Sequence, residues 1–131
     1  MKRSEMREQA FYLTFEKLFN CEDNMDELIE LYSENVEEVC QYAKDVFAGT
    51  NEKKEELVSV INTFSKSWKV SRIPKTTLAI LLVALYEIKY VDTVPENVAI
   101  NEAVELAKKF GTKEDASYIN GILGAFSRSK Q

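Results

Sequence analysis

The sequence predicts an all-α protein of about seven helices. Apolar residues recur at spacings of three and four along most of the chain, which is the period of a helix with one buried face. The 131 residues include only four glycines and two prolines, too few for a β fold with many turns. A chain of this length is expected to form one domain, residues 1–131.

In the first half of the chain, the pattern of apolar residues predicts helices separated by short polar segments. The first spans Ser4–Phe19, and its apolar face consists of Phe11, Phe15, Leu18 and Phe19 at i, i+4, i+7 and i+8. A second spans Met25–Tyr32 and a third Val36–Ala48. Gly49–Asn51 is expected to interrupt or kink the chain before helix resumes over Glu52–Trp68. The pattern leaves open whether the last two segments are one bent helix or two.

The second half begins with a predicted loop, Ser71–Pro74, because proline disfavours helix before it and is tolerated in a first turn. The following helix, Lys75–Tyr90, is apolar nearly all round from Leu78 to Leu85, so it should be the buried centre. A seam between two packed helical subdomains is expected near residues 69–74.

Two further helices complete the prediction. Pro95 opens the first of them, and Gly111 is expected to close it as a left-handed cap. Asp115 is a suitable N-cap for the last helix. Asn101 and Asn120 are polar residues within these packed helices, so we expect them to hydrogen-bond between helices, with Gly121 allowing a close approach.

The net charge of −5 is unevenly distributed. Residues 1–20 carry four cations and three acids, residues 21–60 three cations and twelve acids, and residues 61–131 ten cations and seven acids. If the two ends meet in the fold, the surface is polarised and a polyanion would bind the ends. The alternative is that the acidic middle is simply a solvated helical face.

Several classes of function and location are disfavoured. The chain has no histidine, which removes the usual zinc sites and histidine-based acid–base catalysis. Carboxylate, lysine or cysteine chemistry remains conceivable, but no motif marks a site for it, so we expect no metal, no cofactor and no enzymatic activity. Cys21 and Cys40 are expected to be free thiols in a cytoplasmic protein. The longest apolar run has eight residues, far fewer than a membrane span needs, and the N-terminus lacks the apolar core of a secretion signal.

Three segments resemble the NusB family of bacterial transcription antitermination factors. The most specific is VAINEAVELAKKFG (98–111) followed by INGIL (119–123). The others are LAILLVALYEI (78–88) and MREQAFYLTF (6–15). The resemblance implies a two-subdomain helical fold that binds boxA-type single-stranded RNA. It further implies that binding occurs jointly with the small-subunit ribosomal protein NusE, within the transcription elongation complex.

The resemblance places RNA contacts at an N-terminal basic segment and beside the loop after residue 110. The matching residues here are Lys2, Arg3, Arg7, Lys108, Lys109 and Phe110. The alternatives are ordinary solvated charge for the cations and a last core position for Phe110. The two groups are far apart in sequence, so they make one site only if the fold brings them together.

Two positions depart from the family pattern. Thr77 stands where an acidic residue is usual, and Leu82 where an arginine is usual. Losing both charges together keeps a buried setting neutral, but it affects the NusE contact if these positions belong to a partner surface. Glu87 is expected to be structural. A competing hypothesis is therefore a diverged protein–protein adaptor without RNA binding, and a homodimer is a further possibility.

Overall fold

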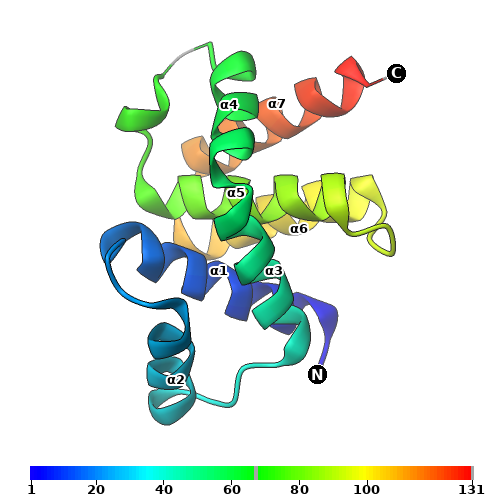
Figure 1. Cartoon of the computed structure of the whole chain (residues 1–131). Helices are drawn as coiled ribbons and strands as arrows, with labels where there is room; N and C mark the ends of the chain where they lie inside the picture. The colour runs from blue at the N-terminus through cyan, green and yellow to red at the C-terminus, as the bar shows by residue number, and fades with distance from the viewer. Residues whose placement is uncertain (67, 131) are drawn as a thin grey trace.

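The computed structural model describes residues 1–66 and 68–130, which form seven α-helices and one short 3-10 turn, with no strand among them (Figure 1). This confirms the all-α prediction. The helices are α1 (Arg3–Phe19), α2 (Met25–Asn35), α3 (Gln41–Glu52), α4 (Lys54–Phe64), α5 (Lys75–Tyr90), α6 (Glu96–Phe110) and α7 (Lys113–Ser129), and the 3-10 turn is η1 (Val70–Arg72).

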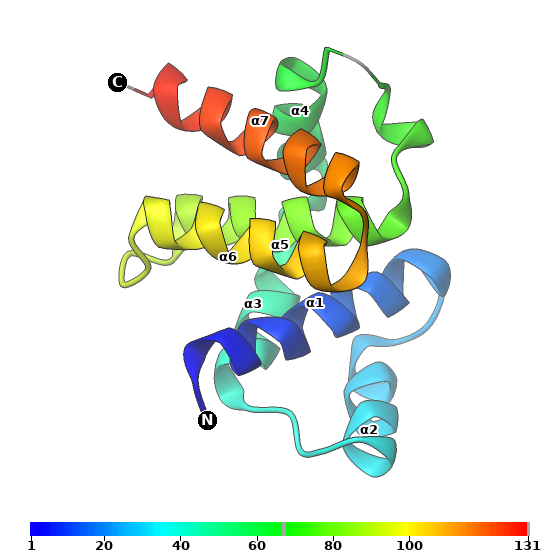
Figure 2. The same cartoon turned by 180° about the vertical axis from the view of Figure 1, so that it is seen from behind.

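Helix α5 is the centre of the fold and contacts α1, α3, α4, α6 and α7. Figures 1 and 2 show α6 and α7 stacked on one side of it and α1 crossing on another, with α2 beside α1 at the edge of the molecule. The residues from Ala79 to Leu85 are each at most 2% exposed. The prediction of a buried central helix is therefore confirmed, and none of the helices described is long and apolar enough to cross a membrane.

The buried side chains form two clusters. The larger joins α4, α5, α6 and α7 with Phe11 of α1. The smaller joins α1, α2 and α3 with Val83 of α5. Because Leu57 and Ile61 of α4 belong to the larger cluster, the division between the two groups lies between α3 and α4. A subdomain seam near residues 69–74 stays a prediction, and this grouping of buried side chains places α4 with the C-terminal helices.

Helix α3 begins five residues later than the sequence predicted, and the buried side chain of Gln9 explains the delay. Its amide nitrogen donates to the Glu38 carbonyl at 3.1 Å and to the Glu37 carboxylate at 2.8 Å. Its amide oxygen accepts from the Cys40 backbone N–H at 2.9 Å. Two backbone groups of the non-helical stretch, the Glu38 carbonyl and the Cys40 N–H, therefore find partners outside a helix.

Gly49 does not interrupt a helix as predicted, because α3 continues through it to Glu52. A Cβ atom at Gly49 would lie 2.1 Å from the ring of Tyr86 in α5. The glycine is therefore required by the close approach of two helices rather than by a turn.

The connection from α6 to α7 also differs from the prediction. Gly111 has φ −132° and ψ −149°, an extended conformation rather than a left-handed cap. The N-cap of α7 is Thr112, whose hydroxyl accepts from the Asp115 N–H at 3.1 Å while the Asp115 carboxylate accepts from the Thr112 N–H at 2.9 Å. Asp115 is thus the third residue of a reciprocal capping box.

Candidate nucleic-acid interface

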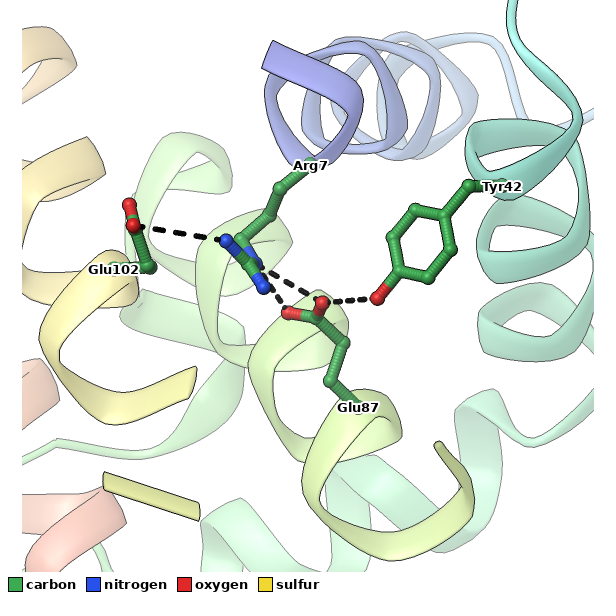
Figure 3. Close-up of polar contacts among 4 residues, drawn as sticks. All are labelled: Arg7, Tyr42, Glu87 and Glu102. Atoms are coloured by element: carbon green, nitrogen blue, oxygen red, sulfur yellow. Dashed lines mark hydrogen bonds and ion pairs between the residues drawn. The ribbon is translucent and has the colours of Figure 1, made fainter. Parts of the chain in front are cut away.

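Arg7 lies in a buried polar network that joins four helices (Figure 3). Its Nε donates to both carboxylate oxygens of Glu87, at 2.7 and 3.0 Å, and a guanidinium nitrogen lies 3.9 Å from Glu102. The Tyr42 hydroxyl donates to the same Glu87 carboxylate. The side chains of Arg7 and Glu87 are 3% and 0% exposed. The prediction that Glu87 is structural is confirmed.

The electrostatics of this network favour a charged Arg7 and a neutral Tyr42. Burial alone would lower the pKa of the Arg7 guanidinium, but the hydrogen bonds and negative charge of Glu87 outweigh burial, so the pKa is raised. Burial and the hydrogen bond to Glu87 raise the pKa of Tyr42 to about 12. The third guanidinium nitrogen, Nη2, has no hydrogen-bond partner among the described residues, but it is buried as well. Burial and the contact with Glu87 favour a structural role for Arg7, and its contact with RNA stays a prediction.

The C-terminal end of α6 meets the middle of α1. Lys109 Nζ lies 3.0 Å from both carboxylate oxygens of Glu8, a residue 101 positions away. The Phe110 ring stacks on Phe11 with centroids 5.2 Å apart and meets Tyr12 edge-on at 5.4 Å. Phe110 is half-buried and packs against the larger cluster, which favours a core position over a stacking surface for a base.

The exposed N-terminal cations lie elsewhere on α1. Arg3 and Glu8 are five residues apart, so their side chains leave the helix about 140° apart. The Arg3 guanidinium lies 4.0 Å from the Tyr42 ring centroid, on the side of α3. Lys2 is exposed, and its backbone N–H donates to Glu5 at 3.0 Å to start α1. The fold therefore joins the end of α6 to α1 without bringing it to Lys2 and Arg3.

The surface beside Lys109 is acidic. A pocket of about 210 Å³ is lined by the following six residues: Glu5, Glu8, Gln9, Tyr32, Glu37 and Lys109. Three carboxylates around one already paired ammonium repel a polyanion. This face is poorly suited to a phosphate backbone.

The other side of α6 provides a more suitable surface. A groove of about 400 Å³ runs between α6 and α7, and we define this α6–α7 groove by the residues that line it: Asn101, Val104, Lys108, Lys113, Ala116, Ser117 and Asn120. Two ammonium groups, two carboxamides and a hydroxyl surround an apolar floor. Such groups donate to phosphate oxygens and to base edges. Among the described residues, Lys108 is the one groove-lining residue that forms a salt bridge. Its partner is the exposed Glu105, at 3.5 Å.

Asn101 and Asn120 are exposed in this groove, which corrects the expectation that they hydrogen-bond between helices. A Cβ at Gly121 would have no neighbour within 4 Å, so this glycine allows no close approach either. Sequence reasoning missed Lys113 and Ser117 altogether. The signal was present, since Lys113, Ser117 and Asn120 fall at i, i+4 and i+7 on one face of α7.

Thr77 and Leu82 are each 1% exposed. They lie on the central helix, where burial favours a packing role, and a partner contact at these positions stays a prediction. The Thr77 hydroxyl has no hydrogen-bond partner among the residues described. Leu82 borders a cavity of about 10 Å³ that is also lined by Thr14 and Thr50. An apolar side chain suits this setting because an unpaired arginine would be costly there.

No cluster of three or more acidic, cysteine or histidine side chains suited to a metal ion occurs among the residues that the structure describes. Residues 1–66 and 68–130 form an all-helical protein with a polar, cationic groove between α6 and α7. The chain belongs to the NusB family, which matches residues 4–128.

Several curated relatives align with most of this chain. A transcription antitermination protein NusB of Agathobacter rectalis is 38% identical, with 97% of this chain and all of that protein covered. One from Acetivibrio thermocellus is 46% identical over 83% of this chain and 74% of its own length. Among solved structures, a NusB of T. maritima has a TM-score of 0.86 at 24% identity, covering 98% of this chain and 92% of its own.

A second solved structure contains the antitermination factors NusB and NusE in complex with double-stranded RNA. The matched chain has a TM-score of 0.86 at 20% identity, with 97% of this chain and 96% of that chain covered. At this level of identity the likeness shows the fold alone.

Proposed function

We propose that this chain is a transcription antitermination factor of the bacterial cytoplasm. It binds boxA-type single-stranded RNA together with the ribosomal protein NusE, and it takes part in the elongation complex without catalysing a reaction. Membership of the NusB family supports this function. The α6–α7 groove is the observation that carries it, because the groove offers donors for RNA on an otherwise acidic protein.

In this proposal the RNA backbone passes along the groove. Lys108 and Lys113 neutralise phosphates, while Asn101 and Asn120 donate to and accept from base edges or ribose hydroxyls. Both lysines are exposed, so their side chains bind phosphate without giving up a buried contact. With so few cations, RNA affinity of the chain alone should be modest and strongly dependent on salt.

The residues predicted from the resemblance have different roles in this proposal. Lys2 and Arg3 are exposed and add positive charge near the N-terminus. Lys109 contributes only when RNA displaces Glu8 from it, because the carboxylate already binds its ammonium. Arg7 acts as a positioning residue that holds α1 against α5 and α6.

The test is binding of boxA-type RNA and of a scrambled RNA of equal length, each with and without NusE. We expect NusE to increase the affinity for boxA-type RNA more than for the scrambled RNA. A chain that binds NusE but neither RNA would contradict the proposal and support the adaptor hypothesis. Sedimentation of the free chain tests the possible homodimer in the same preparation.

A further inference from the structure

The connection between α4 and α5 is unusually cationic. No aspartate or glutamate occurs between Glu56 and Glu87, whereas Lys66, Lys69 and Arg72 fall within seven residues. All three are exposed. None of them forms a salt bridge with any other residue that the structure describes. Their charge is therefore available to an anion.

Trp68 lies among these cations and is 42% exposed. Its ring packs against Tyr118 of α7, with centroids 4.9 Å apart and planes at 48°. The Tyr118 hydroxyl is hydrogen-bonded to the Ser65 hydroxyl at 2.6 Å. The indole therefore contacts Tyr118 while the residue remains partly exposed to solvent. A partly exposed aromatic ring with two lysines close to it in sequence resembles the stacking surfaces of proteins that bind single strands.

The position of this surface connects it to the groove. Tyr118 is next in sequence to Ser117, which lines the α6–α7 groove. The α4–α5 connection contacts the first half of α7 through Tyr118, and Figure 2 shows the connection beside the turn between α6 and α7. Successive residues of a helix leave its axis about 100° apart, so an RNA strand leaving the groove has to pass around α7 by about that angle to reach Trp68.

We propose that Lys66, Trp68, Lys69 and Arg72, named here the Trp68 patch, bind a single-stranded RNA segment that extends beyond the groove. A base stacks on the exposed face of the indole, and the three cations lie beside neighbouring phosphates. This inference rests on the proposed RNA-binding function and lengthens the RNA segment that the protein covers.

Trp68 is the single tryptophan of the chain, so its fluorescence reports directly on stacking at the patch. The probes are boxA-type RNA alone and the same RNA with a single-stranded uridine extension at either end. We expect quenching by an extended RNA and little change with the short one. Trp68→Ala should weaken binding of the extended RNA about tenfold, whereas Trp68→Phe, which keeps a stacking ring, should weaken it far less.

The charge of the patch is tested without changing the indole. Lys66→Gln with Lys69→Gln should reduce the slope of log affinity against log salt by about 1.4 for the extended RNA. The matched control is Lys44→Gln with Lys53→Gln, which removes two cations from the acidic region 21–60. The control should change this slope much less.

Two results would overturn the inference while the proposed function stands. One is that short and extended RNA bind equally well with unchanged fluorescence. The other is that Trp68→Ala weakens binding of NusE but not of extended RNA, which would make the patch a protein contact. Failure of both RNAs to bind, with or without NusE, would instead contradict the proposed function itself.

Discussion

Replacing Arg7 by alanine should strongly destabilise the protein. The substitution leaves the Glu87 carboxylate 0% exposed, with the Tyr42 hydroxyl as its remaining donor. An ionised carboxylate without its cation in such a site is costly, because burial removes water and nothing replaces the charge. Arg3→Ala, four residues earlier on the same helix, removes an exposed guanidinium and is the matched control.

The size of the effect follows from the burial of both partners. Removing one partner of a buried, hydrogen-bonded ion pair costs about 3–5 kcal/mol. The free energy of unfolding of a domain is about 5–15 kcal/mol in total. For a chain of this length each kcal/mol shifts the melting temperature by about 4 °C, so Arg7→Ala should lower it by about 10–20 °C. Arg3→Ala should cost about 1 kcal/mol or less, since it loses a single exposed contact with Tyr42.

The assay is thermal and urea unfolding followed by circular dichroism. The double variant Arg7→Met with Glu87→Leu should recover most of the lost stability, because it removes both charges and keeps the volume filled. If Arg7→Ala proves as stable as Arg3→Ala, and instead changes the salt dependence of RNA binding, Arg7 is not a buried structural residue and the network described above is wrong.

Two smaller perturbations test the packing around α3. The pKa of Tyr42 is raised to about 12, above about 10 in an unfolded chain, so its stabilising contribution is complete below pH 10 and is lost as the pH rises from 10 to 12. The difference in unfolding free energy between the wild type and Tyr42→Phe should therefore narrow by about 2 kcal/mol between pH 8 and pH 12, and a constant difference would contradict this. Gly49→Ala should destabilise by about 1–3 kcal/mol, because its Cβ would lie 2.1 Å from the Tyr86 ring. Gly121→Ala, whose Cβ meets nothing within 4 Å, should stabilise by about 0.5–1 kcal/mol in the same thermal melts.

The sequence was sufficient for the parts of the fold that depend on local periodicity. The central helix and the start of α6 after Pro95 follow from apolar spacing and proline chemistry. The start of α3 could not be predicted in this way, because Gln9 holds the preceding segment from 31 residues away. The role of Gly49 likewise depends on Tyr86, a residue of a different helix.

The candidate site also depends on contacts between residues that are distant in sequence. The resemblance assigns Arg7 to a basic segment with Arg3, but Arg7 precedes Phe11 by four residues and so continues the buried stripe. Its partner Glu87 is 80 residues away. The apolar neighbours of Asn101 predict a structural role, but helical geometry places Asn101 on the same face as the exposed Lys108 seven residues later.

The most direct test of the central claim, that RNA lies in the α6–α7 groove, is a salt titration of boxA-type RNA binding by Lys108→Gln with Lys113→Gln. Each lost phosphate contact reduces the slope of log affinity against log salt by about 0.7 for single-stranded RNA, so we expect a reduction of about 1.4. Lys44→Gln with Lys53→Gln controls for net charge. An unchanged slope in the groove variant, or an equal change in the control, would contradict the claim.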